Sequence, residues 1–133
     1  MPLFIMTEEA YTLIEREANA LFGILPGGVP WFHVPPERLQ LVQQVTMTIA
    51  ARELAYFNQD VLSNEISVDE IKTILGTTPE ETRAALKTLR EQRVAVPLDQ
   101  ELKIWRASLS GLFWALRDIR EHLESETTDE ASH

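Results

Sequence analysis

The chain has 133 residues and a mass of 15.2 kDa, which suits one domain with a substantial core but not two. A net charge of −9 excludes a protein that coats nucleic acid or anionic membranes through its overall charge. The absence of cysteine excludes disulfides, thiolate metal sites and cysteine nucleophiles. No segment approaches the roughly 18 apolar residues of a membrane helix. We therefore expect one cytoplasmic domain over residues 1–125, a disordered acidic tail over 126–133, and no membrane partner.

The first part of the chain, residues 7–35, reads as a helix followed by a loop. Thr7 and the two carboxylates after it are typical of a helix start. The helical spacing of apolar residues continues until Gly23. Residues 23–36 hold three Gly and four Pro, so we predict no regular structure there. Within this loop, Trp31 is either an exposed docking anchor or folded inward together with Phe32.

A long helix is predicted from Pro36 to about Asn58. Proline is pre-set for the first position of a helix. The residues that follow are apolar on more than one side of the helix. A helix of this kind is usually central and covered by others.

Two short capped helices follow. Ser67 and Glu70 form a predicted capping box, and Gly76 is a suitable left-handed stop. Thr78 and Glu81 form a second capping box, with proline at the first helical position. Two helices joined by a Gly-Thr-Thr turn are the helix-turn-helix pattern.

The remainder reads as a β-hairpin and a final helix. Residues 94–96 and 102–105 alternate around a polar turn. The helix begins at Ser108 or Ser110 and ends near residue 123, with a narrow apolar seam of coiled-coil spacing. Either this seam packs on its own domain or it forms a homodimer interface. The residues predicted for that interface are Leu109, Leu112, Phe113, Leu116, Ile119 and Leu123.

The order of these elements is that of a winged helix-turn-helix domain. Residues 66–108 resemble bacterial winged-helix transcriptional regulators of the broad superfamily that includes MarR-like, GntR-like and PadR-like proteins. Together with the helices predicted before and after it, this resemblance leads us to expect a mostly α fold with a two-stranded wing, extra N-terminal helices, a winged-helix core over 36–108 and an amphipathic C-terminal helix over 109–124. It is carried by Ser67-Val68-Asp69-Glu70-Ile71, Leu75-Gly76 and Thr82-Arg83-Ala84-Ala85-Leu86-Lys87-Thr88-Leu89-Arg90-Glu91-Gln92-Arg93-Val94.

A cluster of basic residues lies on this motif. Arg83, Lys87 and Arg90 fall within about 60° of one another on the second helix. Residues 83–106 hold six basic and three acidic residues, a local charge of +3, whereas residues 1–82 sum to −8 and residues 107–133 to −4. Either this face contacts DNA or it is an ordinary charged surface. The candidate DNA contacts are Arg83, Lys87, Arg90, Arg93, Lys103 and Arg106.

Signals of catalysis are poor. His33, His122 and His133 are scattered, and no second ligand set accompanies Asp118 and Glu121 beside His122. We therefore expect no enzyme activity, cofactor or metal. The predicted function is a homodimeric transcriptional regulator that binds double-stranded DNA. The alternative is an acidic winged-helix protein-interaction module that binds a polymerase or another nucleic-acid machine and does not bind DNA itself.

Overall fold

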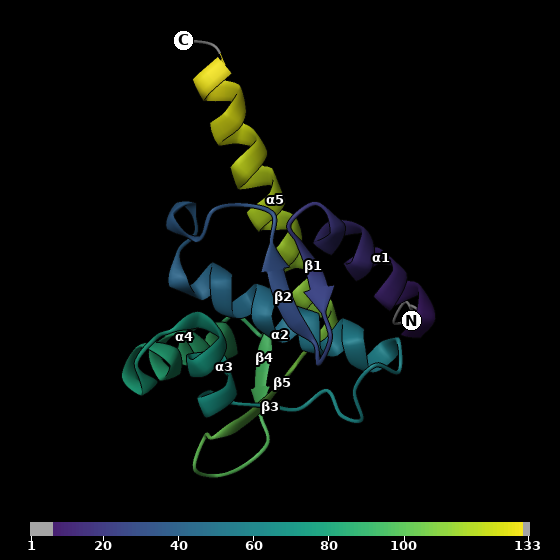
Figure 1. Cartoon of the computed structure of the whole chain (residues 1–133), viewed down its shortest axis with the longest axis vertical. Coiled ribbons are helices and arrows are strands. Elements are labelled where there is room, and N and C mark those ends of the chain that lie inside the picture. Colours follow the sequence, from purple (N-terminus) through teal and green to yellow (C-terminus); the bar gives the residue numbers. More distant parts are fainter. Residues whose placement is uncertain (1–6, 132–133) are drawn as a thin grey trace.

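The computed structural model describes the backbone of residues 7–131 and the side chains of residues 8–126 (Figure 1). Five α-helices in this range are accompanied by two small antiparallel sheets, with strand orders β1-β2 and β3-β5-β4, so the mostly helical class is confirmed. No helix among the described residues combines the length and the apolar character needed to cross a bilayer. The elements are α1 (Thr7–Asn19), β1 (Phe22–Leu25), β2 (Val29–Phe32), the 3₁₀ helix η1 (Pro36–Arg38), α2 (Leu41–Phe57), β3 (Ile66–Ser67), α3 (Val68–Leu75), α4 (Pro79–Glu91), β4 (Ala95–Pro97), β5 (Ile104–Ala107) and α5 (Leu109–Ala131).

Helix α2 is the centre of the molecule. It packs against every other α-helix and against strands from both sheets (Figure 1). An unbroken run from Val45 to Ala51 is buried, which requires neighbours on all sides of the helix. This central position, which the apolar residues of α2 predicted, makes α2 the platform on which the other elements are placed.

The predicted irregular loop over residues 23–36 is corrected, because most of it forms a β-hairpin. Pro26 and Gly27 occupy the middle of a type II turn, which the Gly28 N–H closes by donating to the Leu25 carbonyl at 3.1 Å. Pro30 is tolerated within β2 because a two-stranded sheet has two open edges. The Gly and Pro residues that argued against regular structure are thus the turn and edge residues of a hairpin.

The two aromatic residues of β2 differ in their surroundings. Phe32 is partly buried and packs against the core, whereas Trp31 is 62% exposed. The inward alternative therefore holds for Phe32 and the outward alternative holds for Trp31.

The predicted helix from Pro36 to Asn58 is also corrected. It is divided into η1 and α2 by Leu39, which has extended backbone angles and is 7% exposed. The Gln40 N–H donates to Gln43 Oε1 at 2.9 Å, which starts a new helix after the break. Burying the Leu39 side chain against the core requires this change of direction, and the helical spacing of the sequence does not reveal it.

Helices α3 and α4 form where the sequence predicts them, and the predicted hairpin forms with its strands at 95–97 and 104–107 instead of 94–96 and 102–105. The hairpin gains a third strand because Ile66 pairs with Trp105. One detail differs at the start of α3. Ser67 Oγ accepts from the Glu70 N–H as expected, but the Glu70 carboxylate binds Arg52 of α2 instead of returning to the Ser67 backbone.

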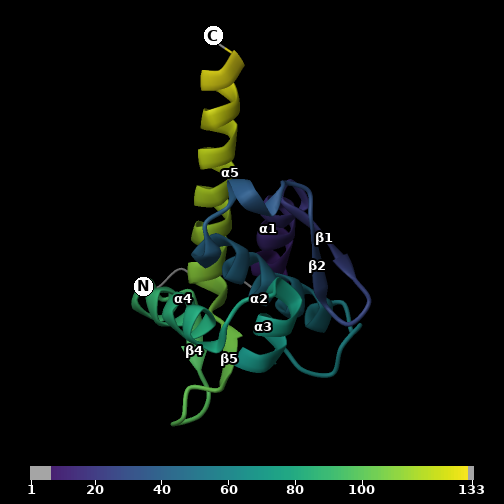
Figure 2. The same cartoon turned by 60° about the vertical axis from the view of Figure 1, so that its left-hand side comes forward.

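Helix α5 is longer than predicted. It continues to Ala131 and projects beyond the rest of the molecule (Figures 1 and 2), so residues 126–131 are helical where a disordered tail was expected. Side-chain pairs four residues apart support the extension. Arg120 Nη1 lies 3.1 Å from Glu124, and His122 Nε2 lies 3.0 Å from Glu126. The last two residues of the predicted tail lie outside the described range.

Candidate nucleic-acid interface

Helix α4 is positioned by its start and by its apolar face. Thr78 Oγ1 accepts from the Glu81 N–H at 3.1 Å, and the Thr78 N–H donates to Glu81 Oε1 at 3.0 Å. The Glu81 carboxylate accepts hydrogen bonds from the Thr78 N–H and from the Thr78 side chain, and these hold the pKa of the exposed Glu81 carboxyl below its ordinary value. One face of α4 packs against the core, and the other face is therefore exposed to solvent. The buried residues are Thr82, Ala85, Leu86 and Leu89.

The basic side chains predicted on α4 are exposed. Arg83, Lys87 and Arg90 lie on the face opposite the buried residues, as helical spacing requires. No ion pair to a carboxylate is found for these three among the described side chains. The guanidinium and ammonium groups are therefore free to meet an external anion.

Arg93 follows α4 and has a left-handed backbone with φ of 63°. Its N–H donates to the Arg90 carbonyl at 3.0 Å, and the Val94 N–H donates to the Leu89 carbonyl at 2.8 Å. These two bonds form a Schellman motif, which usually places glycine where Arg93 stands. The motif ends α4 sharply and turns the chain directly into the hairpin.

The loop between β4 and β5 is held by its own hydrogen bonds. Asp99 Oδ1 accepts from the Lys103 N–H at 2.8 Å and from the Ile104 N–H at 3.0 Å. The Trp105 indole N–H donates to the Leu102 carbonyl at 2.9 Å. Asp99 is a positioning residue that the sequence pattern did not reveal, although Asp is typical of such turns.

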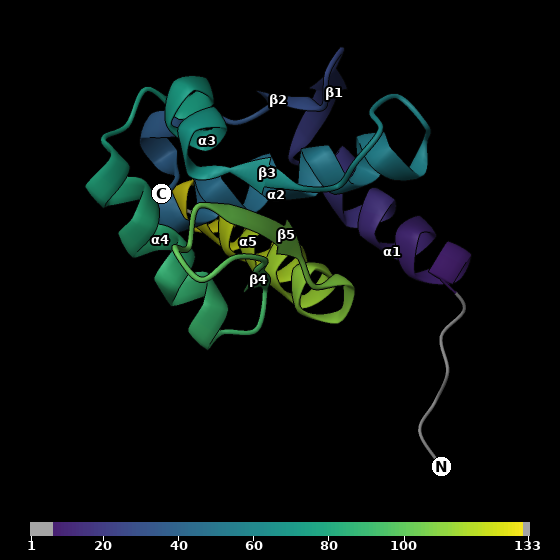
Figure 3. The same ribbon diagram turned by 90° about the horizontal axis from the view of Figure 1, so that it is seen from below.

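Lys103, in the loop before β5, and Arg106, on β5, are both exposed. The hairpin lies beside α4 when the molecule is seen from below (Figure 3). Lys103 Nζ is 2.8 Å from Glu101 Oε2, and this pair raises the pKa of Lys103. The positive charge of Arg83 acts in the opposite direction on the same pKa, which places Arg83 of α4 within electrostatic reach of the hairpin.

Arg52 of α2 is a second positioning residue that the sequence pattern did not reveal. Its Nη1 donates to the Glu65 carbonyl at 2.7 Å, and its Nη2 binds the Glu70 carboxylate. One guanidinium thus joins α2 to the segment before β3 and to the first turn of α3. It fixes the helix that precedes α4.

The seam predicted for a dimer interface is largely occupied within the chain. Helices α1 and α5 pack side by side, and four of the six seam residues are at most 7% exposed. This is the packing on the chain's own domain that the sequence left open. The buried members are Leu112, Leu116, Ile119 and Leu123, while Leu109 and Phe113 are partly buried at the margin of the core.

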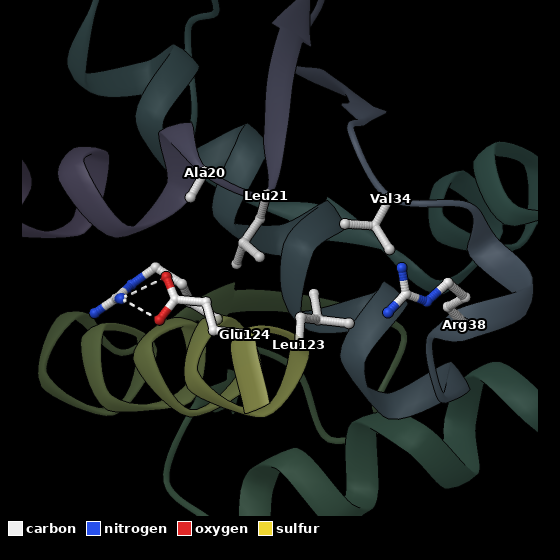
Figure 4. Close-up of a pocket in the computed structure, with 7 residues that line it drawn as sticks. Ala20, Leu21, Val34, Arg38, Leu123 and Glu124 are labelled. Carbon is white, nitrogen blue, oxygen red and sulfur yellow. Dashed lines mark hydrogen bonds and ion pairs between the residues drawn. The ribbon is translucent and has the colours of Figure 1, made fainter. Parts of the chain in front are cut away.

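A pocket of about 550 Å³ lies between the end of α1, η1 and α5, with Leu21, Val34 and Leu123 as its apolar surface (Figure 4). Its charged groups are engaged with neighbours. Arg120 binds Glu17 and Glu124, and Arg38 Nη2 is 3.5 Å from Glu126. Since the two guanidinium groups already meet carboxylates, the basic surface of α4 remains the candidate site.

Among the described residues, no group of three or more His, Asp or Glu side chains is placed to hold a metal ion. The chain was compared with protein-family models, with curated proteins and with solved structures, and none of the three gives a significant match.

Proposed function

We propose that this protein is a cytoplasmic, homodimeric transcriptional regulator that binds double-stranded DNA through a winged helix. The element order from α2 to α5 and the strand order β3-β5-β4 support the proposal, since helix, strand, two helices and a hairpin follow one another as in that fold. In this assignment α4 is the recognition helix and the β4–β5 hairpin is the wing.

One observation carries the proposal. All six candidate basic residues are exposed, and they come from α4, from the turn that follows it and from the β4–β5 hairpin, within a chain that is otherwise strongly acidic. Charge segregation of this kind gives a local site for an anion without general attraction to nucleic acid. The members are Arg83, Lys87, Arg90, Arg93, Lys103 and Arg106.

The residue types fit the two kinds of DNA contact. Arg83 and Arg90 on the exposed face of α4 would reach base edges in the major groove, where arginine binds the O6 and N7 atoms of guanine. Lys87 on the same face, and Arg93, Lys103 and Arg106 around it, would meet phosphates and set the register. Binding that rests on few phosphate contacts in an acidic protein would fall steeply as salt rises.

Electrophoretic mobility shift with duplex DNA tests this assignment. The wild-type protein is expected to retard duplex DNA at about 50 mM salt, and the retardation is expected to weaken strongly by about 200 mM. The double variant Arg83→Ala, Lys87→Ala should abolish the shift. A matched control, Arg16→Ala with Arg38→Ala, removes the same charge from other surfaces and should retain the shift. Absence of binding by the wild type at low salt would overturn the proposal.

The proposed homodimer would use the part of α5 that the chain's own core leaves uncovered. Trp114 is 58% exposed and meets Phe113 edge to face at 5.2 Å between ring centroids. Light scattering is expected to give twice the chain mass of 15.2 kDa for the wild type. The Trp114→Glu variant should instead give the mass of one chain, because it places a charge in the proposed contact. A monomeric wild type at high micromolar concentration would exclude the dimer. DNA binding would still be decided by the mobility shift.

The second candidate function is an acidic interaction module without DNA binding. It is favoured by Glu101, which sits at the wing and neutralises Lys103 at 2.8 Å. In this case the mobility shift would be absent at every salt concentration. The two candidates are therefore separated by the same measurement.

A further inference from the structure

We propose that the outer face of the β1–β2 hairpin, with the groove beside it, binds an apolar and basic segment of a partner protein. We call this surface the hairpin groove; it comprises Leu25, Val29, Trp31, Asp69 and Ile74. The proposal does not depend on DNA binding, because none of these residues belongs to α4 or to the wing.

The hairpin presents an uncovered indole. Trp31 is 62% exposed, compared with 2% for Trp105 in the core. The sheet register pairs Trp31 with Gly23, which has no side chain to cover the ring, and pairs Val29 with Leu25, which is 38% exposed. Directly paired residues of an antiparallel sheet share a face. The outer face of the hairpin is therefore apolar, with a large aromatic side chain of the type that dominates protein interfaces.

A groove continues this face toward α3. It has a volume of about 350 Å³ and is lined by Val29 of the hairpin, by Thr73 and Ile74 of α3 and by Arg52 of α2. The apolar hairpin face and the groove meet at Val29. Together they offer an anchor and a recess next to it, which a flat surface with one exposed apolar residue does not.

The surface is held in a fixed shape. Pro30, between Val29 and Trp31, is buried on the opposite face of the hairpin. Gly28 lies so close to α2 that a Cβ there would be 3.3 Å from Arg52 Nε and 3.2 Å from Ala55 Cβ. A pre-formed surface binds without the ordering of side chains and loops that weakens association.

The charge at the rim defines the partner. Asp69 and Glu70 line the groove, and the only cation in its lining, Arg52, already binds the Glu70 carboxylate and the Glu65 carbonyl. Residues 1–82 hold four basic and twelve acidic residues. Because Arg52 is already paired, the carboxylates at the rim favour lysine and arginine of a partner over nucleic acid. A second copy in the same orientation would bring another acidic face to it, so we assign the surface to a different protein.

The β1–β2 hairpin and α4 lie on different sides of the molecule (Figures 2 and 3). A partner on the hairpin would therefore leave the basic surface open. This arrangement suits a protein that joins a basic partner to DNA. The proposed binding surface would serve equally well if the protein is an interaction module that does not bind DNA.

A peptide titration followed by NMR tests the proposal. The probe is an amphipathic helix of about 14 residues, or four turns, with leucine on one face and lysine on the other. The three tryptophans give separate indole N–H signals, and we expect the Trp31 signal to move while the Trp105 and Trp114 signals stay in place. A peptide with glutamate in place of lysine, and one with serine in place of leucine, should each bind at least about tenfold more weakly, because charge and apolar contact both contribute.

Single-residue variants distinguish specific binding at Trp31 from nonspecific binding to exposed apolar residues. Trp31→Ala should weaken the lysine peptide by about tenfold or more. Leu62→Ala is the matched control, because Leu62 is fully exposed at another place and its loss should leave binding unchanged. Asp69→Asn should weaken binding a few-fold and reduce its salt dependence. Circular dichroism of each variant confirms that it is folded.

Three results would overturn the proposal. Equal binding by Trp31→Ala and wild type would show that Trp31 is not the anchor. Equal binding of the lysine and glutamate peptides would show that the surface does not select a basic partner. An oligomer that Trp31→Ala dissociates would show that a second copy covers the surface instead. Each of these results is independent of the mobility-shift outcome.

Discussion

At the scale of single residues, Gly111 allows α5 to approach the chain that leaves α4. A Cβ at this position would lie 2.0 Å from the Arg93 carbonyl oxygen and 2.8 Å from the Arg93 carbonyl carbon. These atoms belong to the backbone of the Schellman motif, so they cannot move aside as a flexible side chain would. Gly111 therefore sets the distance between α5 and the end of the proposed recognition helix.

Gly111→Ala is expected to destabilise the protein by about 1–3 kcal/mol, because the clash outweighs the better helix propensity of alanine. Urea denaturation measures the change as a lower midpoint. Gly23→Ala is the control, because its added Cβ would meet His33 Nε2 at an ordinary 3.6 Å. Equal midpoints for the two variants would show that the approach of α5 is less constrained than described.

Glu53 is a buried carboxyl of α2 with an incomplete set of partners. It is 2% exposed, and Asn64 Nδ2 donates to its Oε1 at 3.4 Å, while no hydrogen bond reaches Oε2 from the described residues. Burial raises the pKa of Glu53, and hydrogen bonds from Asn64 and Tyr11 and the charge of Arg106 oppose the shift. Burial and the nearby Glu53 in turn raise the pKa of Tyr11 to about 12. The neutral acid is the form that suits this site.

The contribution of Glu53 to the free energy of unfolding should therefore fall as pH rises through the pKa of its carboxyl group. The folded pKa lies above the ordinary value of 4.5, so this stabilisation is fully present below pH 4.5 and is lost as pH rises through the folded pKa. Glu53→Gln should equal wild type in acid and exceed it at neutral pH, as measured by thermal melts across that range. Glu81→Gln is the contrasting control, because the lowered pKa of Glu81 gives stability that is lost as pH falls. A constant difference between Glu53→Gln and wild type would contradict the prediction.

At the scale of elements, α1 and α5 are joined by a charged contact between Arg120 and Glu17. Arg120 binds the Glu17 carboxylate, with Nη2 3.3 Å from Oε1, and reaches Glu124 one turn later. These carboxylates raise the pKa of Arg120 above its already high value. Glu17 is only 8% exposed, so removing its partner would leave a nearly buried charge uncompensated.

Arg120→Ala is expected to lower Tm clearly, through the loss of this contact between α1 and α5. Arg117→Ala provides the matched control, because its pair with Glu121 is about half exposed and should contribute little. Differential scanning calorimetry measures both variants. A loss of Tm for Arg117→Ala as large as that for Arg120→Ala would contradict the role of the buried contact.

The elements that the sequence predicted are those with local signals. Capping residues, apolar spacing and turn residues placed α3, α4 and the β4–β5 hairpin, because each signal acts within a few residues. The break at Leu39 depends on a tertiary contact of one buried side chain, which no local pattern encodes. The β1–β2 hairpin differs from the predicted loop because its Pro and Gly residues occupy a tight turn and an edge strand, where they are compatible with a sheet.

The candidate site was predicted more completely for its basic residues than for the residues that hold them in place. Helical spacing identified the exposed face of α4. Arg52 and Asp99 act through the Glu65 carbonyl and through loop N–H groups, respectively, and such contacts follow only from the fold. The same holds for the seam of α5, where the spacing predicted an apolar face but could not say which helix covers it.

At the scale of the whole molecule, the distribution of charge should govern DNA binding, and Glu101 opposes it. The Glu101 carboxylate lies at the wing and neutralises Lys103. Glu101→Gln is expected to tighten DNA binding a few-fold at low salt, with a smaller gain at high salt, because screening weakens the effect of one surface charge. Fluorescence anisotropy with a labelled duplex measures the change. Glu126→Gln, which removes a charge near the far end of α5, should not produce it.

The long reach of α5 has a practical consequence. Its far end at Ala131 and the tip of the β4–β5 hairpin lie at opposite ends of the molecule (Figures 1 and 2). A fluorophore, affinity handle or surface linkage attached after α5 would hold the protein with the β4–β5 hairpin pointing away from the support. Immobilised-protein assays can therefore be built on this chain without blocking the surfaces whose binding they are meant to detect.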